Sequence, residues 1–250
     1  MSRDTIRLPH DAYRLLQTLR AAGHSAYVVG GCVRDSLLGR LPGDWDICTS
    51  ARPDEMKALF HDQRLILTGE KHGTVAVILH GKPYEMTTYR LDGSYRDHRH
   101  PDNVQFVDDL AADLARRDFT INAMAWSLNG DTFGELVDPF DGMSDLEECI
   151  IRTPCDPDVT FSDDPLRMMR AVRFASQLGF TIEEETFEAI RRNAARIRIV
   201  SRERIITELN KIVLSPVPSI GFELLELTGL LELIFPELHN LKGVERRGKH

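Results

Sequence analysis

The most constraining feature of this chain is a pair of glycines followed closely by two acids. Gly30 and Gly31 come directly after a short run of apolar and aromatic residues, and Asp44 and Asp46 flank Trp45. This order predicts a strand, a tight glycine turn, the start of a helix and then a second strand. Side chains alternate faces along a strand, so the two carboxylates are expected to point the same way.

Two carboxylates on one face repel each other unless a cation lies between them. Mg²⁺ commonly binds one or two carboxylates and completes its shell with phosphate oxygens, and a glycine turn lets the backbone approach a phosphate closely. We therefore hypothesise metal-dependent chemistry on a nucleotide, with Asp44 and Asp46 binding two Mg²⁺ ions. Glu85 is the candidate third catalytic carboxylate, because its strand is expected to lie beside residues 45–49. By itself, an Asp-x-Asp motif also fits a solvated turn or a helix cap.

Composition restricts the remaining possibilities. The 250 residues, 42% of them hydrophobic, are enough for a substantial core. No apolar run approaches the ~20 residues that cross a bilayer, so no membrane partner is expected. The apolar surroundings of Cys32 and Cys48 favour core thiols in a reducing cytoplasm. The net charge of −8 disfavours a large nucleic-acid footprint without excluding a local basic face, and no protein partner can be inferred.

The pattern of elements predicts an α+β head followed by helices. In the head we expect helices at residues 11–22, 35–38, 53–60 and 110–126, strands at 25–29, 45–49, 74–79, 84–89 and 105–107, and a loop at 91–103. Further helices are expected at 164–178, 183–195, 202–214 and 220–227. We place the catalytic head at 1–144, a helical neck at 145–215 and the start of a helical body at 216–250. The polar stretch 241–250 contains no closing helix, which suggests a piece of a longer polypeptide.

Arg117 and Asp118 form a second candidate site beside the expected helix 110–126. Arginine can bind a phosphate through two parallel hydrogen bonds, and aspartate can accept a hydrogen bond from a ribose hydroxyl. Spacing alone favours the alternative, in which both residues form surface ion pairs.

A third pattern is an arginine stripe. Arg167, Arg170 and Arg173 recur every three residues on a helix that is expected to begin at Pro165, with Asp164 as its N-cap. Such stripes are usually solvated. Here the apolar neighbours predict that part of the stripe is buried, and a buried arginine needs an acceptor.

These motifs, taken in order, resemble the signature of class II tRNA nucleotidyltransferases and bacterial poly(A) polymerases, in the polymerase β-like superfamily. The matching segments are residues 30–40, 44–46, 116–125, 138–142, 163–175 and 201–209. The resemblance implies a head with a mixed, mostly antiparallel sheet and flanking helices, an all-helical neck and a partial body. It also implies template-independent addition of CMP and AMP, from CTP and ATP, to the 3′ acceptor end of tRNA. The segment 90–101 looks like the flexible loop of the CCA-adding and A-adding branch.

The resemblance also implies roles for single residues. Gly30, Gly31 and Arg34 would meet the triphosphate, Asp118 the ribose, and Arg170 and Arg173 the base or a phosphate. Asp164 and Arg167 would select the base. A carboxylate accepts and a guanidinium donates, which matches the Watson–Crick edges of C and A, whereas G and U present the reverse order. Family members usually carry Glu where this chain has Asp163, which leaves the Asp164–Arg167 assignment intact.

RNA contacts are expected on the helical part, with candidates Lys211, Arg246 and Arg247. Several alternatives stay open at this point. An enzyme that adds only CC or only the final A, and a poly(A) polymerase, are close alternatives. A non-catalytic RNA-binding module and a glycosyltransferase acting on a nucleotide sugar are more distant ones.

Overall fold

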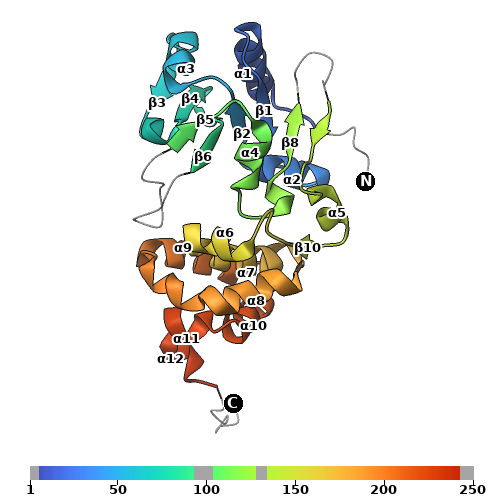
Figure 1. Cartoon of the computed structure of the whole chain (residues 1–250), viewed down its shortest axis with the longest axis vertical. Coiled ribbons are helices and arrows are strands. Elements are labelled where there is room, and N and C mark those ends of the chain that lie inside the picture. Colours follow the sequence, from blue (N-terminus) through green and yellow to red (C-terminus); the bar gives the residue numbers. More distant parts are fainter. Residues whose placement is uncertain (1–5, 93–103, 128–133, 243–250) are drawn as a thin grey trace. The chain divides into compact units, whose positions relative to one another are not determined.

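The computed structural model describes residues 6–92, 104–127 and 134–242, and the chain divides into two compact units. The head unit comprises residues 1–148 and 152–155, and the helical unit comprises 149–151 and 156–250. Their elements are labelled in Figure 1. In the described part of the chain, no helix is long and apolar enough to cross a membrane.

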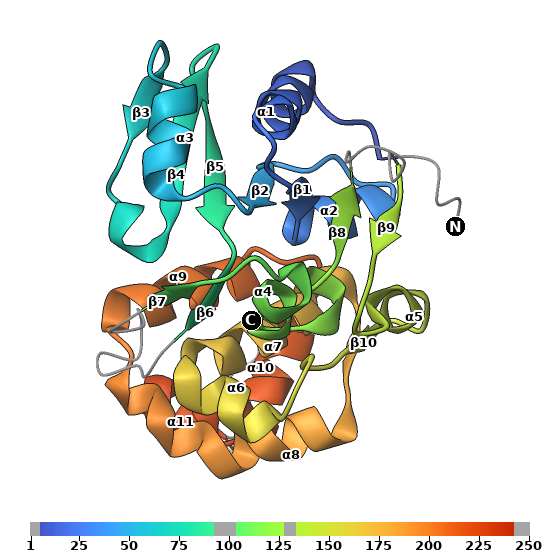
Figure 2. The ribbon, with the colours of Figure 1, turned by 45° about the horizontal axis from the view of Figure 1, so that its top comes forward.

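The head unit is built on a seven-stranded sheet with the order β3-β4-β5-β2-β1-β8-β9. Its strands are β1 (Ala26–Val29), β2 (Asp46–Thr49), β3 (Arg64–Ile66), β4 (Thr74–Leu79), β5 (Lys82–Thr88), β8 (Ala125–Ser127) and β9 (Leu136–Val137). Most strands of this sheet are labelled in Figure 2. Neighbouring strands are antiparallel except β2 and β5, which are parallel with Ile47 opposite Met86. The expected mixed, mostly antiparallel sheet is confirmed, as is the position of β5 beside β2.

Helices and short elements complete the head. They are α1 (His10–Ala21), α2 (Gly31–Leu37), α3 (Pro53–Leu59), η1 (Glu70–His72), α5 (Gly142–Glu147) and a ribbon of β6 (Arg90–Asp92) with β7 (Val104–Phe106). α1 buries Leu15, Leu16 and Leu19, at the spacing of one helical face. α2 begins at Gly31, directly after the glycine turn and earlier than the expected start at residue 35. Most of the expected loop, residues 93–103, lies outside the described residues.

The helix expected over residues 110–126 is wrong in its second half. The chain there forms helix α4 (Leu110–Ala115), the 3₁₀ turn η2 (Thr120–Asn122) and strand β8. Asp118 ends the helical path, because its Oδ1 accepts hydrogen bonds from the Phe119 N–H at 2.9 Å and from Asn122 Nδ2 at 3.0 Å. Such local bonds give the backbone an alternative to the helix.

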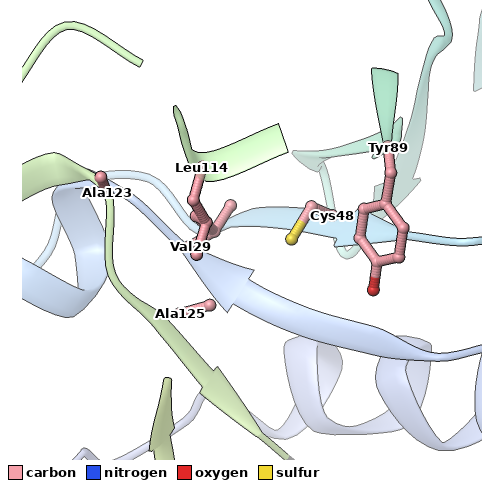
Figure 3. Close-up of a cluster of buried hydrophobic side chains, with 6 residues drawn as sticks. All are labelled: Val29, Cys48, Tyr89, Leu114, Ala123 and Ala125. Carbon is pink, nitrogen blue, oxygen red and sulfur yellow. The ribbon is translucent and has the colours of Figure 1, made fainter. Parts of the chain in front are cut away.

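A buried cluster packs α4 against the sheet. Leu114 lies over Val29 and Ala125, while Cys48 on β2 and Tyr89, directly after β5, extend the cluster (Figure 3). Because side chains alternate along β2, the acid Asp46 emerges on the same face as Cys48. The cluster therefore forms the apolar support beneath the acidic end of the strand.

The helical unit consists almost entirely of helices. They are α6 (Pro157–Asp163), α7 (Leu166–Leu178), α8 (Glu184–Asn193), η4 (Ala194–Ile199), α9 (Arg202–Val213), α10 (Pro218–Leu227), α11 (Leu230–Ile234) and α12 (Pro236–His239), with a two-stranded parallel pair of β10 (Ile150–Ile151) and β11 (Thr181–Ile182). The four expected helices are present, whereas α6, α11 and α12 are not among the expected elements. Gly221 lets α10 approach α9, since a Cβ there would lie 2.4 Å from Ile212.

Candidate active site

The paired acids lie at the start of β2 and share one face. Asp46 is the first residue of β2 and Asp44 precedes the strand, and both are exposed while Trp45 between them is buried. The parallel pairing of β2 with β5 places Glu85 at the level of Asp46 on the neighbouring strand. Three carboxylates therefore gather at one end of the sheet.

Electrostatic coupling shows how close these acids are. Desolvation and the charge of Glu85 raise the pKa of Asp46 to about 6, with a smaller contribution from Asp44, while Arg117 opposes the shift. An acid whose ionised form is disfavoured by its neighbours is stabilised when a cation binds beside it. The carboxylates at the start of β2 thus repel one another, which favours binding of a cation there.

The donor set fits a hard divalent cation. Among the described residues, no group of three or more His, Cys, Asp or Glu side chains is arranged to hold a metal by itself. Asp44 and Asp46 are two exposed carboxylates, which is the number that Mg²⁺ uses when substrate phosphates supply further oxygens. These two residues therefore fit a cation that is held jointly with a nucleotide.

The glycine turn lies between two guanidinium groups. Gly30 adopts φ +81°, a conformation that favours glycine, and its N–H donates to the Met124 carbonyl at 3.1 Å. A Cβ on Gly30 would lie 3.1 Å from Arg117 Nη1, and one on Gly31 would lie 3.5 Å from Arg34 Nη2. A positively charged turn without side chains is suited to phosphate oxygens.

A buried hydrogen-bond chain connects the turn to Asp118. Arg34 Nη1 donates to Asn122 Oδ1 at 2.6 Å, and Asn122 Nδ2 donates to Asp118 Oδ1 at 3.0 Å. Arg34 is also paired with Asp35, at 2.8 Å between Nη2 and Oδ1. All three members of the chain are buried, so Arg34 and Asp118 are held at fixed positions relative to each other.

Two residues of this site are missing from the sequence-based assignment. Asn122 is the central link of the chain just described. Asp113 is fully buried and accepts hydrogen bonds from Arg116 and Arg117. The spacing Asp113, Arg116, Arg117 is the available signal, because residues three and four apart meet on a helix.

In the helical unit, Asp164 is held by two groups. Its Oδ1 accepts a hydrogen bond from the N–H of Leu166, the first residue of α7, at 3.1 Å. The N-cap position itself is Pro165 and the helix begins at Leu166, each one residue later than expected. The two oxygens of Asp164 also accept hydrogen bonds from Arg204 Nη1 and Nη2, at 3.2 and 2.7 Å. Arg167, on the first turn of α7, has Nη1 3.4 Å from the Thr160 carbonyl oxygen. The candidate base selector is therefore a preorganised group.

Part of the arginine stripe is buried, as its apolar neighbours predict. Arg170 is half-buried and has Cζ 5.5 Å from the centroid of the Phe174 ring. Arg173 is buried and donates to Glu208 Oε2 at 2.5 Å, across the contact between α7 and α9. The described contacts of Arg173 are those of a residue that holds two helices together.

The RNA candidates differ in their surroundings. Lys211 donates to Glu208 Oε1 at 3.2 Å, so it shares with Arg173 an acidic partner within the protein. Arg246 and Arg247 lie outside the described residues. A groove of about 480 Å³ is lined by Arg198 and Arg202 together with Ile206 and Glu237. Within the described residues, neither arginine of this groove has a hydrogen-bond or ion-pair partner.

This sheet, with paired acids at one strand end beside a glycine turn between two arginines, has the fold of a polymerase β-like nucleotidyltransferase head. The chain belongs to the family whose model is described as the poly A polymerase head domain, which matches residues 26–152. A second model, described as a probable RNA- and SrmB-binding site of polymerase A, matches residues 179–242. The family assignment implies use of a divalent metal.

Similar proteins support this assignment. The CCA-adding enzyme of Lactiplantibacillus plantarum is 50% identical over 217 residues, covering 87% of this chain and 51% of that protein. The enzyme of the same name from Geobacillus thermodenitrificans is 48% identical over 88% of this chain and 53% of its own length. Among solved structures, the Bacillus stearothermophilus CCA-adding enzyme in complex with CTP has a TM-score of 0.80 at 43% identity, covering 90% of this chain and 53% of that one. The chain spans about half the length of the curated relatives it matches.

Proposed function

We propose that this chain adds CMP and AMP, from CTP and ATP, to the 3′ end of tRNA without a template. The observation that carries this proposal is the acid pair Asp44 and Asp46, located beside a glycine turn that Arg34 and Arg117 flank. A module that only bound RNA would gain nothing from paired acids that repel phosphate. The similar proteins reported above are named CCA-adding enzymes, which favours this reaction over other nucleotidyl transfers.

In the reaction, the 3′ oxygen of the tRNA attacks the α-phosphorus of the nucleotide. A phosphodiester bond forms, the bond from the α-phosphorus to the oxygen shared with the β-phosphorus breaks, and pyrophosphate leaves. Two Mg²⁺ ions held by Asp44 and Asp46 would lower the pKa of the attacking hydroxyl and stabilise the charge on the leaving group. Glu85 is the third carboxylate, and its charge beside Asp46 strengthens the attraction for divalent cations.

The remaining head residues bind and orient the nucleotide. Gly30 and Gly31 leave room for phosphate oxygens between Arg34 and Arg117, which offset the negative charge of the triphosphate. Asp118 accepts a hydrogen bond from a ribose hydroxyl, in a position that the bond from Asn122 fixes. This contact favours ribonucleotides over deoxyribonucleotides, because the 2′-hydroxyl is the donor that deoxyribose lacks.

We assign base choice to the helical unit. The Asp164 carboxylate accepts a hydrogen bond from the amino group of C or A, and the Arg167 guanidinium donates to the adjacent ring nitrogen. G and U would place an acceptor opposite the carboxylate and a donor opposite the guanidinium, at a cost of about 1–3 kcal/mol for each mispaired group. Arg170 and Arg173 complete the nucleotide-binding set on α7, with Arg173 acting through the framework that it forms with Glu208.

RNA contacts are proposed for the groove lined by Arg198 and Arg202, within the segment matched by the RNA-binding model. Both arginines are exposed and have no acidic partner among the described residues, so they can neutralise phosphates at little cost. Lys211, which is already paired, contributes less to this binding. Cys32 and Cys48 are buried free thiols, in keeping with a cytoplasmic location.

Defined tRNA ends test the proposed function. The protein is incubated with tRNA ending at the discriminator base, at C or at CC, with each nucleotide singly and with CTP and ATP together, with and without Mg²⁺. Mg²⁺-dependent growth of the first tRNA by C, C and A supports the proposal. Addition of C alone, addition of A only to the CC end, or long A tails would indicate a CC-adding enzyme, an A-adding enzyme or a poly(A) polymerase, respectively.

A further inference from the structure

Among the described residues of the head, Asp113 is the most completely buried acid. It lies in the last turn of α4, and none of its surface is exposed. Its Oδ1 accepts hydrogen bonds from Arg116 Nη2 at 2.8 Å, from Arg116 Nε at 3.1 Å and from the Arg90 N–H at 3.3 Å. Its Oδ2 accepts a hydrogen bond from Arg117 Nη2 at 3.3 Å.

A buried carboxylate is stable only when its partners compensate for lost hydration. Burial alone would raise the pKa of Asp113, but the charges of Arg116 and Arg117 outweigh burial and lower it. Asp113 is therefore ionised at neutral pH. Its two oxygens have different hydrogen-bond donors. Oδ1 accepts hydrogen bonds from Arg116 and the Arg90 backbone, and Oδ2 accepts one from Arg117.

Arg117 needs such an anchor. Its Nη1 lies beside Gly30, where a Cβ would come within 3.1 Å. Its Nε is buried without a hydrogen-bond partner among the described residues. The contact with Asp113 is thus the hydrogen bond that fixes the direction of this guanidinium over the glycine turn.

We propose that Asp113 is a positioning residue that holds the Arg117 guanidinium over Gly30 for contact with the nucleotide triphosphate. The proposal rests on the proposed function for the identity of the ligand. Asp113 itself is covered by protein and does not touch the nucleotide, so it acts only through Arg117. The arrangement also accounts for the arginine doublet: Arg116 neutralises the buried acid, which leaves Arg117 able to serve a ligand.

The test compares three single variants and one double variant of the full chain. Asp113→Asn keeps the size of the side chain and removes its charge, and we expect CTP affinity to fall about 10-fold. Arg117→Gln is expected to lower CTP affinity by at least the same factor. The double variant Asp113→Asn/Arg117→Gln should bind CTP no more weakly than Arg117→Gln alone, because both changes remove one function.

Arg116→Gln is the matched control, since it removes the other partner of the same carboxylate. We expect it to change CTP affinity less than 3-fold and to be additive with Arg117→Gln. Equal losses in Arg116→Gln and Asp113→Asn, or additive losses in the Asp113/Arg117 double variant, would overturn the proposal. If Asp113→Asn does not fold, the double variant Asp113→Asn/Arg116→Gln takes its place in the comparison, because it removes both charges of the buried pair.

A crystal structure of Asp113→Asn without nucleotide separates this inference from the proposed function. The inference requires that the Arg117 guanidinium leaves Gly30 while β1 and β2 keep their register. An unmoved Arg117 would refute the positioning role, whatever the protein binds. Failure of the wild-type chain to bind CTP would instead contradict the proposed function.

Discussion

The carboxylate of Asp164 is held by Arg204 through two hydrogen bonds, of 2.7 and 3.2 Å, which connect the start of α7 to α9. The same carboxylate accepts a hydrogen bond from the Leu166 N–H at the start of α7. A carboxylate has about four acceptor positions, so three protein donors leave room for one more. The plane of Asp164 is therefore fixed before any base arrives.

Replacing Arg204 should relax base choice. With Arg204→Gln, Asp164 loses the paired hydrogen bonds that orient its carboxylate. We expect the preference for CTP over UTP to fall about 10-fold, which corresponds to the free-energy cost of one mispaired buried polar group. The measurement is the ratio of kcat/KM for the two nucleotides. Arg192→Gln is the control, because it breaks an exposed pair with Asp158 on another helix. An unchanged ratio in Arg204→Gln would show that the ion pair is only structural.

Arg167→Ala should also loosen selectivity, by removing the proposed donor to the base. We expect CTP and ATP to lose their advantage over UTP and GTP by about 10-fold or more, while pyrophosphate release changes less. The measurement is competitive incorporation from an equimolar nucleotide mixture. Persistence of the wild-type preference would move the base selector to other residues.

Asp46→Asn should abolish nucleotidyl transfer while the fold survives. The amide cannot hold a divalent cation as the carboxylate does, so we expect the rate to fall at least about 100-fold. Because desolvation by the surrounding protein and the charge of Glu85 raise the pKa of Asp46 to about 6, the folded state binds a proton more tightly than the unfolded state. The stabilising contribution of Asp46 is therefore complete below pH ~4 and is lost as the pH rises through about 6.

The direction of this pH dependence can be tested by a stability measurement that is independent of activity. Without metal, Asp46→Asn should have a higher Tm than the wild type at pH 7.5 and the same Tm at pH 4. Mg²⁺ should raise the Tm of the wild type at pH 7.5 and leave the variant unchanged. A lower Tm for Asp46→Asn at pH 7.5 would contradict the repulsion inferred among the acids.

Removing the groove arginines should weaken tRNA binding in a salt-dependent way. For Arg198→Gln or Arg202→Gln, we expect the slope of log K against log salt concentration to become less steep by about one unit. Glu237→Gln, on the same groove, should act in the opposite direction and tighten binding. Lys211→Gln is the control for a paired cation. If all four variants share the wild-type slope, the RNA lies on another surface.

Gly30→Ala should damage both stability and nucleotide binding. Its φ of +81° costs an alanine about 1–3 kcal/mol, and the new Cβ would push against Arg117 Nη1. Gly23 is the matched control, because its φ is +89° and a Cβ there meets nothing within 4 Å. Thermal unfolding should show a lower Tm for both Gly30→Ala and Gly23→Ala, whereas CTP affinity should fall only for Gly30→Ala.

Much of the head could be predicted from local patterns in the sequence. The continuous apolar run of residues 74–79 gives β4 with the expected bounds, and placing β5 beside β2 brings Glu85 to the acids. These predictions succeed because burial on one or both faces of a strand leaves a pattern in the sequence. The start of α7 is predictable to within one residue, since Asp before Pro is a strong start signal for a helix.

What could not be predicted depends on side chains that override the pattern. Residues 116–125 have helical spacing, but the hydrogen bonds accepted by Asp118 redirect the backbone into η2 and β8. Burial of Asp113 is equally invisible, because an acid three residues before an arginine usually marks a solvated pair. The links between Arg34, Asn122 and Asp118 join residues far apart in the chain, which no local pattern records.

The single parallel pairing of the sheet affects how the head assembles. The chain between β2 and β5, residues 50–81, contains α3, β3 and β4 and forms the crossover that joins the two strands. Closing such a loop costs chain entropy, so we expect this contact to form later than the local hairpin of β4 and β5. Until the crossover closes, Asp44 and Asp46 would be separate from Glu85 and solvated. We therefore expect the repulsion among the three carboxylates, and the affinity for cations that follows from it, to arise only when the sheet is complete.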